Sequence, residues 1–186
     1  MSDADKRARL IEIVRQRSYG TGVEIKLASG RTSDFYFNLK PTMLHAEGAY
    51  LIGELVLDAI ASLGATHIGG LEVGAIPIAT TVVAASHRRN TPIDAFFVRK
   101  EVKAHGTQKL VEGLVPGDSL AGHTVVVVED VTTTGGSSLK AAEIVRAQHA
   151  TLASVVTVVD REEGAADSFE AAGIPFTAIL KRSDFL

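Results

Sequence analysis

Four consecutive valines, Val125 to Val128, constrain the fold of this chain more than any other feature. Side chains alternate between the two faces of a β-strand, so a run without a polar interruption is buried only where both faces of its sheet are covered. Sheets covered on both faces are mostly parallel, with helices on each side. We therefore expect an α/β fold whose mostly parallel central sheet is flanked by helices.

The rest of the sequence alternates apolar strands with amphipathic helices. Residues 19–22 end an N-terminal helix, and two extended runs around a Ser-Gly-Arg turn predict a β-hairpin "hood" within residues 19–40. Helices are expected at residues 3–17, 45–62, 76–88, 137–149 and 165–172, and strands at 23–28, 34–39, 67–71, 93–98, 124–128, 152–159 and 176–180. A chain of 186 residues can bury one substantial core, so we expect a single domain over residues 1–186.

Composition argues against several kinds of protein. Nineteen basic and 22 acidic residues give a net charge of −3, which offers no general attraction for nucleic acid or for an anionic membrane. The chain has no cysteine, and no stretch resembles a signal peptide or the roughly 20 apolar residues of a membrane-spanning helix. We expect a cytoplasmic protein that binds neither nucleic acid nor membrane, with any anion site formed locally.

The segment after the valines has the residues of a sugar-phosphate site. Glu129 and Asp130 follow at the expected carboxyl end of the strand, where ligands of α/β proteins bind. The turn that comes next offers exposed N–H groups and hydroxyls before a helix N-terminus, where Ser137 or Ser138 is expected to be the cap. It consists of Val131, Thr132, Thr133, Thr134, Gly135, Gly136 and Ser137. A plain strand-turn-helix corner is the alternative, but the acidic pair and the threonines favour a ligand.

A polar stretch over residues 99–118, here called the basic loop, is long for a connection within a compact domain, and such loops are often functional or mobile. It begins with Arg99, Lys100, Lys103 and His105. Alone, this run would be a solvated surface. Beside a phosphate site, it is typical of a loop that closes over a substrate and stabilises the charge of a leaving group.

These two segments resemble a known family. The apolar strand, acidic pair and Val-x-Thr-x-Gly pattern resemble the phosphoribosyl pyrophosphate (PRPP) signature of type I phosphoribosyltransferases. The resemblance implies that residues 133–137 hold the 5-phosphate and that Glu129 and Asp130 approach the ribose hydroxyls. Arg-Lys-Glu-x-Lys-x-His-Gly resembles the catalytic loop of orotate phosphoribosyltransferases in particular. A homodimer is then implied, in which Arg99, Lys103 and His105 reach pyrophosphate in the neighbouring active site and Lys100 serves its own.

A site for orotate, a flat pyrimidine carboxylate, requires a cation and a stacking surface. Lys26 offers a cation, Tyr36 and Phe37 offer aromatic faces, and Arg161 follows a predicted strand. Each alone is explained as surface charge or packing. Together their contexts resemble the orotate-binding segments of the same family, which also implies that Thr133 touches the base.

The implied reaction transfers ribose 5-phosphate from PRPP to orotate, giving orotidine 5-monophosphate and pyrophosphate in pyrimidine (UMP) biosynthesis, with Mg²⁺ bound mainly through the substrate pyrophosphate. Two alternatives stay open, a transferase for a purine base and a non-catalytic PRPP sensor. One departure from the family is visible. Some members carry a pyrophosphate-binding lysine where this chain has Val73, so that contact is in doubt, and we expect backbone N–H groups of Gly74 and Ala75 to serve there.

Overall fold

The computed structural model describes the backbone of residues 1–26, 32–101 and 110–186, and the side chains of residues 21–26 and 32–34 lie outside that description. The central sheet has five strands in the order β4-β3-β7-β8-β9, and every neighbouring pair is parallel. The strands are β3 (His67–Gly69), β4 (Asp94–Ala95), β7 (Thr124–Thr132), β8 (Thr151–Asp160) and β9 (Phe176–Lys181). The prediction of a mostly parallel sheet is confirmed.

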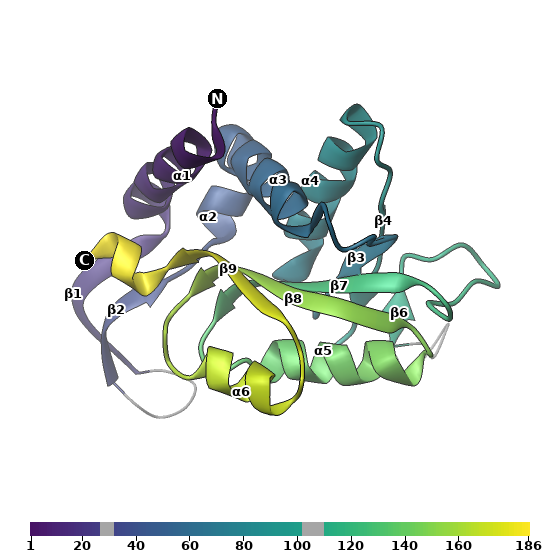
Figure 1. Cartoon of the computed structure of the whole chain (residues 1–186). Helices are drawn as coiled ribbons and strands as arrows, with labels where there is room; N and C mark the ends of the chain where they lie inside the picture. The colour runs from purple at the N-terminus through teal and green to yellow at the C-terminus, as the bar shows by residue number, and fades with distance from the viewer. Residues whose placement is uncertain (27–31, 102–109) are drawn as a thin grey trace.

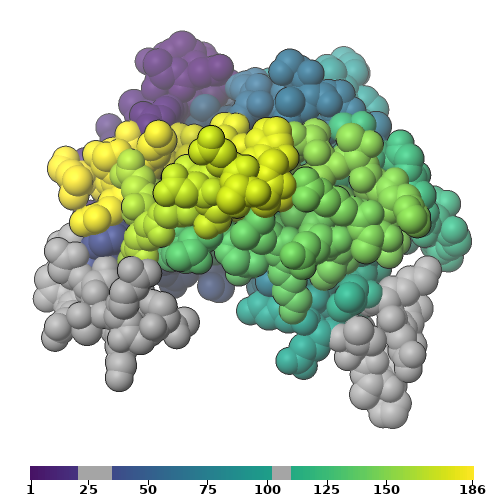
Figure 2. All heavy atoms as spheres, turned by 60° about the horizontal axis from the view of Figure 1, so that its bottom comes forward, coloured from purple at the N-terminus to yellow at the C-terminus, as the bar shows by residue number. Residues whose placement is uncertain are grey.

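Helices cover both faces of this sheet (Figure 1). One face carries α1 (Asp3–Arg17), α3 (Ala46–Ile60) and α4 (Ala75–Arg88), and the other carries α5 (Gly136–Ala147) and α6 (Ala165–Ala171). Figure 2 looks onto the second face, where α5 and α6 lie over the strands. In the described parts of the chain, no helix has both the length and the hydropathy to cross a membrane.

The four valines behave as the alternation rule requires. Val126 and Val128 belong to the core beneath α3 and α4, whereas Val125 and Val127 belong to the core beneath α5 and α6. Each is at most 2% exposed. Full burial of such a side chain contributes about 1.5–3 kcal/mol, so this strand fixes the two helical layers on either side of it.

The predicted hairpin is present as β1 (Tyr19–Lys26) paired antiparallel with β2 (Thr32–Phe37). It begins four residues before the predicted start at residue 23, because Tyr19 pairs with Phe37 as soon as α1 ends. The Tyr19 ring also contacts Phe37 and Phe185, at centroid distances of 5.0 and 5.4 Å. The hairpin therefore packs against the C-terminal turn η1 (Arg182–Phe185), on the side where β7 and β8 end (Figure 1).

The predicted strand at residues 93–98 is divided in two. Asp94 and Ala95 pair with β3 as β4, while β5 (Phe97–Val98) pairs antiparallel with β6 (Val111–Glu112) and keeps one parallel bridge, from Val98 to Leu71, to the segment just after β3. The basic loop is therefore not irregular throughout, because β6 lies within it. Strands of two residues are too short to leave a periodic pattern in the sequence.

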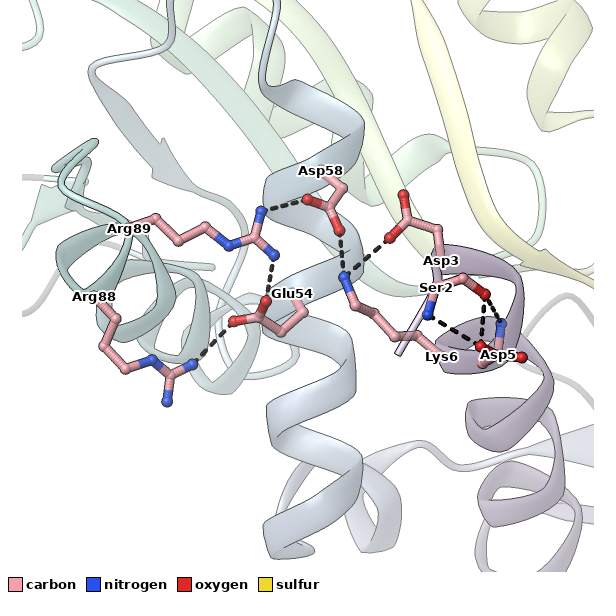
Figure 3. Close-up of polar contacts among 8 residues, drawn as sticks. All are labelled: Ser2, Asp3, Asp5, Lys6, Glu54, Asp58, Arg88 and Arg89. Atoms are coloured by element: carbon pink, nitrogen blue, oxygen red, sulfur yellow. Dashed lines mark hydrogen bonds and ion pairs between the residues drawn. The ribbon is translucent and has the colours of Figure 1, made fainter.

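A network of ion pairs joins α1, α3 and α4 (Figure 3). The Lys6 ammonium lies 2.9 Å from Asp58 of α3, and Arg89, just after α4, pairs with both Asp58 and Glu54. Arg88 adds a 3.0 Å contact to Glu54, which is only 8% exposed. Breaking a partly buried pair leaves a carboxylate without its compensating charge. The helix that precedes the hairpin is thus fixed to the helices that cover the sheet.

One further short element completes the fold. Helix α2 (Lys40–Met43), which the sequence patterns did not predict, follows β2 and begins beside Pro41. Its residue Thr42 is fully buried, and the Thr42 hydroxyl lies 2.7 Å from that of Ser18. The hairpin, η1 and α2 together surround the carboxyl edge of the sheet on one side.

Candidate active site

The carboxyl ends of β3 and β7 define a crevice. These strands are neighbours, but the helices that follow them, α4 and α5, cover opposite faces of the sheet. Ligands of open α/β sheets bind where successive connections diverge in this way. A hollow of about 250 Å³ lies there. Its lining comes from the turn between β3 and α4, the end of β7, the start of α5, and the two cations Lys40 and Lys100.

Strand β7 is longer than predicted and includes the acidic pair. It continues past Val128 to Thr132, because β8 offers a pairing partner through Asp160. Glu129 and Asp130 therefore lie within the strand, and successive side chains point to opposite faces. Glu129 meets Ser138 of α5, whereas a Cβ added to Gly74 at the start of α4 would lie 2.5 Å from Asp130. The two carboxylates thus enter one hollow from its two sides.

Glu129 is held in an environment that disfavours its charge. Burial raises the pKa of its carboxyl, and this outweighs the hydrogen bonds that the hydroxyls of Ser138 and Thr132 donate to it. The neighbouring charge of Asp130 raises the pKa further. A carboxylate kept here at a cost to stability is typical of a functional group.

We expect Glu129→Gln to raise the free energy of unfolding at pH 7. Since the folded-state pKa lies above its ordinary value of 4.5, the unfolded chain loses this proton first, and stability falls as pH rises through the folded pKa. Glutamine keeps an acceptor for Ser138 without the charge. Urea unfolding at pH 4 and pH 7 measures the effect, with Glu143→Gln on the exposed side of α5 as control. Equal stability of wild type and Glu129→Gln at pH 7 would contradict it.

The turn before α5 differs from its prediction at the cap. The N-cap residue is Gly135, with φ +85°, and no side chain caps the helix. Ser138 is turned to Glu129 instead, so the expectation of a serine cap at 137 or 138 is wrong. Glycine takes the position because its backbone is left-handed there and a Cβ would lie 2.9 Å from the Phe169 ring. The first N–H groups of an uncapped helix remain available to an anion.

The predicted PRPP segment divides into an exposed and a buried part. Thr134, Gly136 and Ser137 are exposed and Thr133 is half-buried, and of these four residues Ser137 lines the hollow. Thr132 is 1% exposed, and its hydroxyl oxygen lies 2.9 Å from that of Thr157. Any contact from Thr132 to a ligand would therefore come from its main chain.

The turn between β3 and α4 forms the opposite wall. The Glu72–Val73 peptide bond is cis, and Val73 is 61% exposed. The Ala75 N–H bonds to the carbonyl of Leu71 at 3.4 Å, so it is not presented to a ligand as expected. Among the described residues, no group of three or more His, Asp or Glu side chains could hold a metal by itself.

The basic loop is described only at its two ends. The Arg99 guanidinium pairs with Glu112 of β6 at 3.2 Å, whereas Lys100 lines the hollow and donates its backbone N–H to Glu72 at 2.9 Å. Lys103 and His105 lie outside the described residues. The structure thus brings Lys100 to the crevice and turns Arg99 toward the base of the loop.

The residues predicted for a base are only partly brought together. Arg161 is 5% exposed, pairs with Glu163 at 2.7 Å, and lies over the Phe35 ring at 4.6 Å. Arg182 lies on the same ring at 4.1 Å. The sequence analysis did not identify Phe35 or Arg182. The alternation of side chains along β2 could have shown that Phe35 lies on the opposite face from Tyr36.

The aromatic pair Tyr36 and Phe37 cannot form one stacking surface. Successive residues of β2 point to opposite faces, so Phe37 joins the cluster of Tyr19 and Phe185. The Tyr36 ring instead lies against Gly20 and is 40% exposed. Lys26 ends β1, and its side chain lies outside the described part of the structure.

Comparison with known proteins agrees with this geometry. The phosphoribosyl transferase domain family matches residues 42–172. An orotate phosphoribosyltransferase of a Bradyrhizobium strain is 55% identical over 186 residues, covering 100% of both chains. The crystal structure of Mycobacterium tuberculosis orotate phosphoribosyltransferase with Fe(III) dicitrate has a TM-score of 0.83 and 42% identity, covering 97% of this chain and 98% of that one. A second structure of that enzyme, with PRPP, has a TM-score of 0.79 and 38% identity over the same shares.

Proposed function

This chain belongs to the orotate phosphoribosyltransferases, and from that premise we propose how its own residues transfer ribose 5-phosphate from PRPP to orotate. The products are orotidine 5-monophosphate and pyrophosphate, a step of pyrimidine biosynthesis. The observation that carries the assignment of roles is the crevice between β3 and β7, where an acidic pair faces an uncapped helix N-terminus. A purine base and a non-catalytic sensor role are less well supported, because the full-length relatives are transferases named for orotate.

The 5-phosphate is held by the turn of residues 133–137. Its supports are the exposed Thr134 and Ser137 hydroxyls and the first N–H groups of α5, toward which the helix dipole attracts negative charge. Val131 and Thr132 contribute only through their main chains. Gly135 has to be glycine for the helix to begin at this place.

The ribose and the metal lie near the acidic pair. Glu129 and Asp130 accept hydrogen bonds from the ribose hydroxyls, which suits two carboxylates that reach one hollow from opposite sides. Mg²⁺ prefers oxygen ligands and retains several waters, so the pyrophosphate oxygens supply most of its shell. Of the three carboxylates that line the hollow, Asp130 and Glu72 would hold this ion or its waters. When bound, Mg²⁺ neutralises charge on the leaving pyrophosphate.

Orotate occupies the side of the crevice nearest the hairpin. The buried Arg161 suits its carboxylate, since a guanidinium binds that group with two parallel hydrogen bonds. Thr133 and Lys26 contribute polar contacts to the base. Because Tyr36 and Phe37 lie on opposite faces of β2, only one of them stacks on a given pyrimidine.

Displacement then occurs at the anomeric carbon. The orotate ring nitrogen forms the new bond to this carbon as the bond from the carbon to the pyrophosphate oxygen breaks. Pyrophosphate leaves with the bonding electrons, and the proton of the orotate nitrogen passes to the departing pyrophosphate. Charge develops on its oxygens, where we expect Arg99, Lys100 and Lys103 to stabilise it and His105 to donate a hydrogen bond. Arg99, Lys103 and His105 serve the active site of the partner in a homodimer. Closure of the basic loop excludes water that would hydrolyse PRPP.

The proposal also covers the domain organisation and the cellular location of the protein. We place the whole reaction on one domain over residues 1–186 and the protein in the cytoplasm, without nucleic-acid or membrane partners. Neither the net charge nor the cysteine-free composition conflicts with this.

The test is the loss of orotate ultraviolet absorbance when the purified protein is mixed with PRPP and Mg²⁺. We expect turnover with orotate alone, none with adenine, hypoxanthine or uracil, and loss of turnover when the metal is chelated. Turnover with another base but not with orotate would refute the choice of base. Failure with every base, despite binding of PRPP, would favour the sensor.

A further inference from the structure

The crevice contains a cation that the sequence motifs do not include. Lys40, the first residue of α2, lines the same hollow as Glu72, Gly74, Lys100 and Asp130. It belongs to neither the PRPP segment nor the basic loop. Among the described residues of that hollow, Lys40 and Lys100 are the basic ones.

The backbone beneath Lys40 is firmly held. Leu39 and Thr42 on either side are fully buried, and Met43 is 3% exposed. Asn38 accepts the Lys40 backbone N–H at 3.3 Å, and Pro41 restricts the first turn of α2. The side chain is nevertheless exposed. A fixed backbone thus presents a flexible ammonium to the crevice.

The lining of the hollow has more carboxylates than cations, so a bound pyrophosphate would benefit from the charge of Lys40. The described lining has three carboxylates, Glu72, Glu129 and Asp130, which would repel a pyrophosphate group. None of the ion pairs among the described residues engages Lys40. Its ammonium is therefore available to a ligand. The main chain of Lys100 is already engaged: its N–H donates to Glu72, and its carbonyl accepts a 3.2 Å hydrogen bond from Lys140.

The residue at position 73 suggests a role for the Lys40 ammonium. Where some relatives have a pyrophosphate-binding lysine, this chain has Val73, which lines the same hollow and is 61% exposed. Lys40 lines the same hollow. We propose that Lys40 binds the diphosphate group of PRPP and of the product pyrophosphate, replacing the lysine that is absent at position 73. The proposal rests on the proposed function and assigns one more substrate-binding residue to it.

The first test measures binding without turnover. Titration calorimetry with inorganic pyrophosphate and Mg²⁺ is expected to show about 10- to 100-fold weaker affinity for Lys40→Met than for wild type, the effect of one lost charge-assisted hydrogen bond. Lys40→Arg is expected to retain most of the affinity. Arg146→Met, at the far end of α5, removes the same charge as a matched control and is expected to bind normally. Unchanged affinity in Lys40→Met would overturn the proposal.

The second test moves the cation from position 40 to position 73. Adding Val73→Lys to Lys40→Met is expected to restore pyrophosphate affinity to within a few-fold of wild type, and melting temperatures are expected to match because both positions are exposed. In turnover assays, Lys40→Met should raise the KM for PRPP and leave that for orotate nearly unchanged. A rise in the orotate KM alone would overturn the proposal. If no protein turns over orotate but pyrophosphate binding still depends on Lys40, the proposed function fails and this inference stands.

Discussion

Lys103→Ala is expected to lower kcat about 100- to 1,000-fold, the effect of removing one group that stabilises developing charge. The proposed contact forms only when the basic loop closes and pyrophosphate departs. An interaction made in the transition state lowers kcat, whereas one made equally with the bound substrate changes KM. We therefore expect the KM values for orotate and PRPP to change little. Steady-state orotate consumption at saturating PRPP and Mg²⁺ measures the effect.

A control in the same loop separates this role from a general loss of charge. Lys109 follows the Lys-x-His-Gly motif, and Lys109→Ala removes the same charge. We expect this variant to keep kcat within a few-fold of wild type. Should Lys103→Ala turn over at the wild-type rate, Lys103 would have no part in stabilising the leaving group. Its assignment from the motif would then be wrong.

The fold was predictable because its strongest signal is physical. Val125 to Val128 require a sheet covered on both faces, and the structure places alternate valines in two cores. Element boundaries were less predictable. Strand β7 continues through Glu129 and Asp130 because β8 pairs with it, and pairing between distant segments leaves no mark in local hydropathy.

The site was predictable where a motif fixes the backbone and less so where packing decides. Glu129, Asp130 and Ser137 of the motif line the hollow at the crevice. The cap was wrong because a left-handed Gly135 and the Phe169 ring select the turn, and sequence shows neither. Phe35 and Lys40 were missed for the same reason. Each acquires its neighbours only when the hairpin and α2 fold against the carboxyl edge of the sheet.

The position of Arg161 illustrates the difference between what a sequence motif predicts and what packing determines. Its place after a predicted strand was visible in the sequence, but its near-complete burial was not. The buried guanidinium lies between a carboxylate, Glu163, and the Phe35 ring. A cation held in this way is positioned before the ligand arrives, which lowers the entropy lost on binding. We propose that this arrangement favours recognition of the planar orotate carboxylate over a neutral base.

The proposal that active sites are shared between subunits leads to the second large prediction, which is recovery of activity when two inactive proteins are mixed. Asp130→Asn damages the site in the body of the chain, and Lys103→Ala damages the loop offered to the partner. In a mixed dimer, the undamaged loop of the first protein meets the undamaged body of the second, so one of the two sites is intact. The other site carries both defects.

Equal amounts that reassort freely into two-fold dimers give about half mixed dimers, so about a quarter of wild-type activity should return. The proteins are combined in mild denaturant, refolded together, and assayed for orotate consumption. A chain carrying both substitutions, mixed with either single variant, leaves no intact site and is expected to restore nothing. If each loop served its own subunit, both sites of the mixed dimer would be defective. Activity would then stay at the level of the separate variants, and the proposal of shared sites would fail even though every assigned residue kept its role.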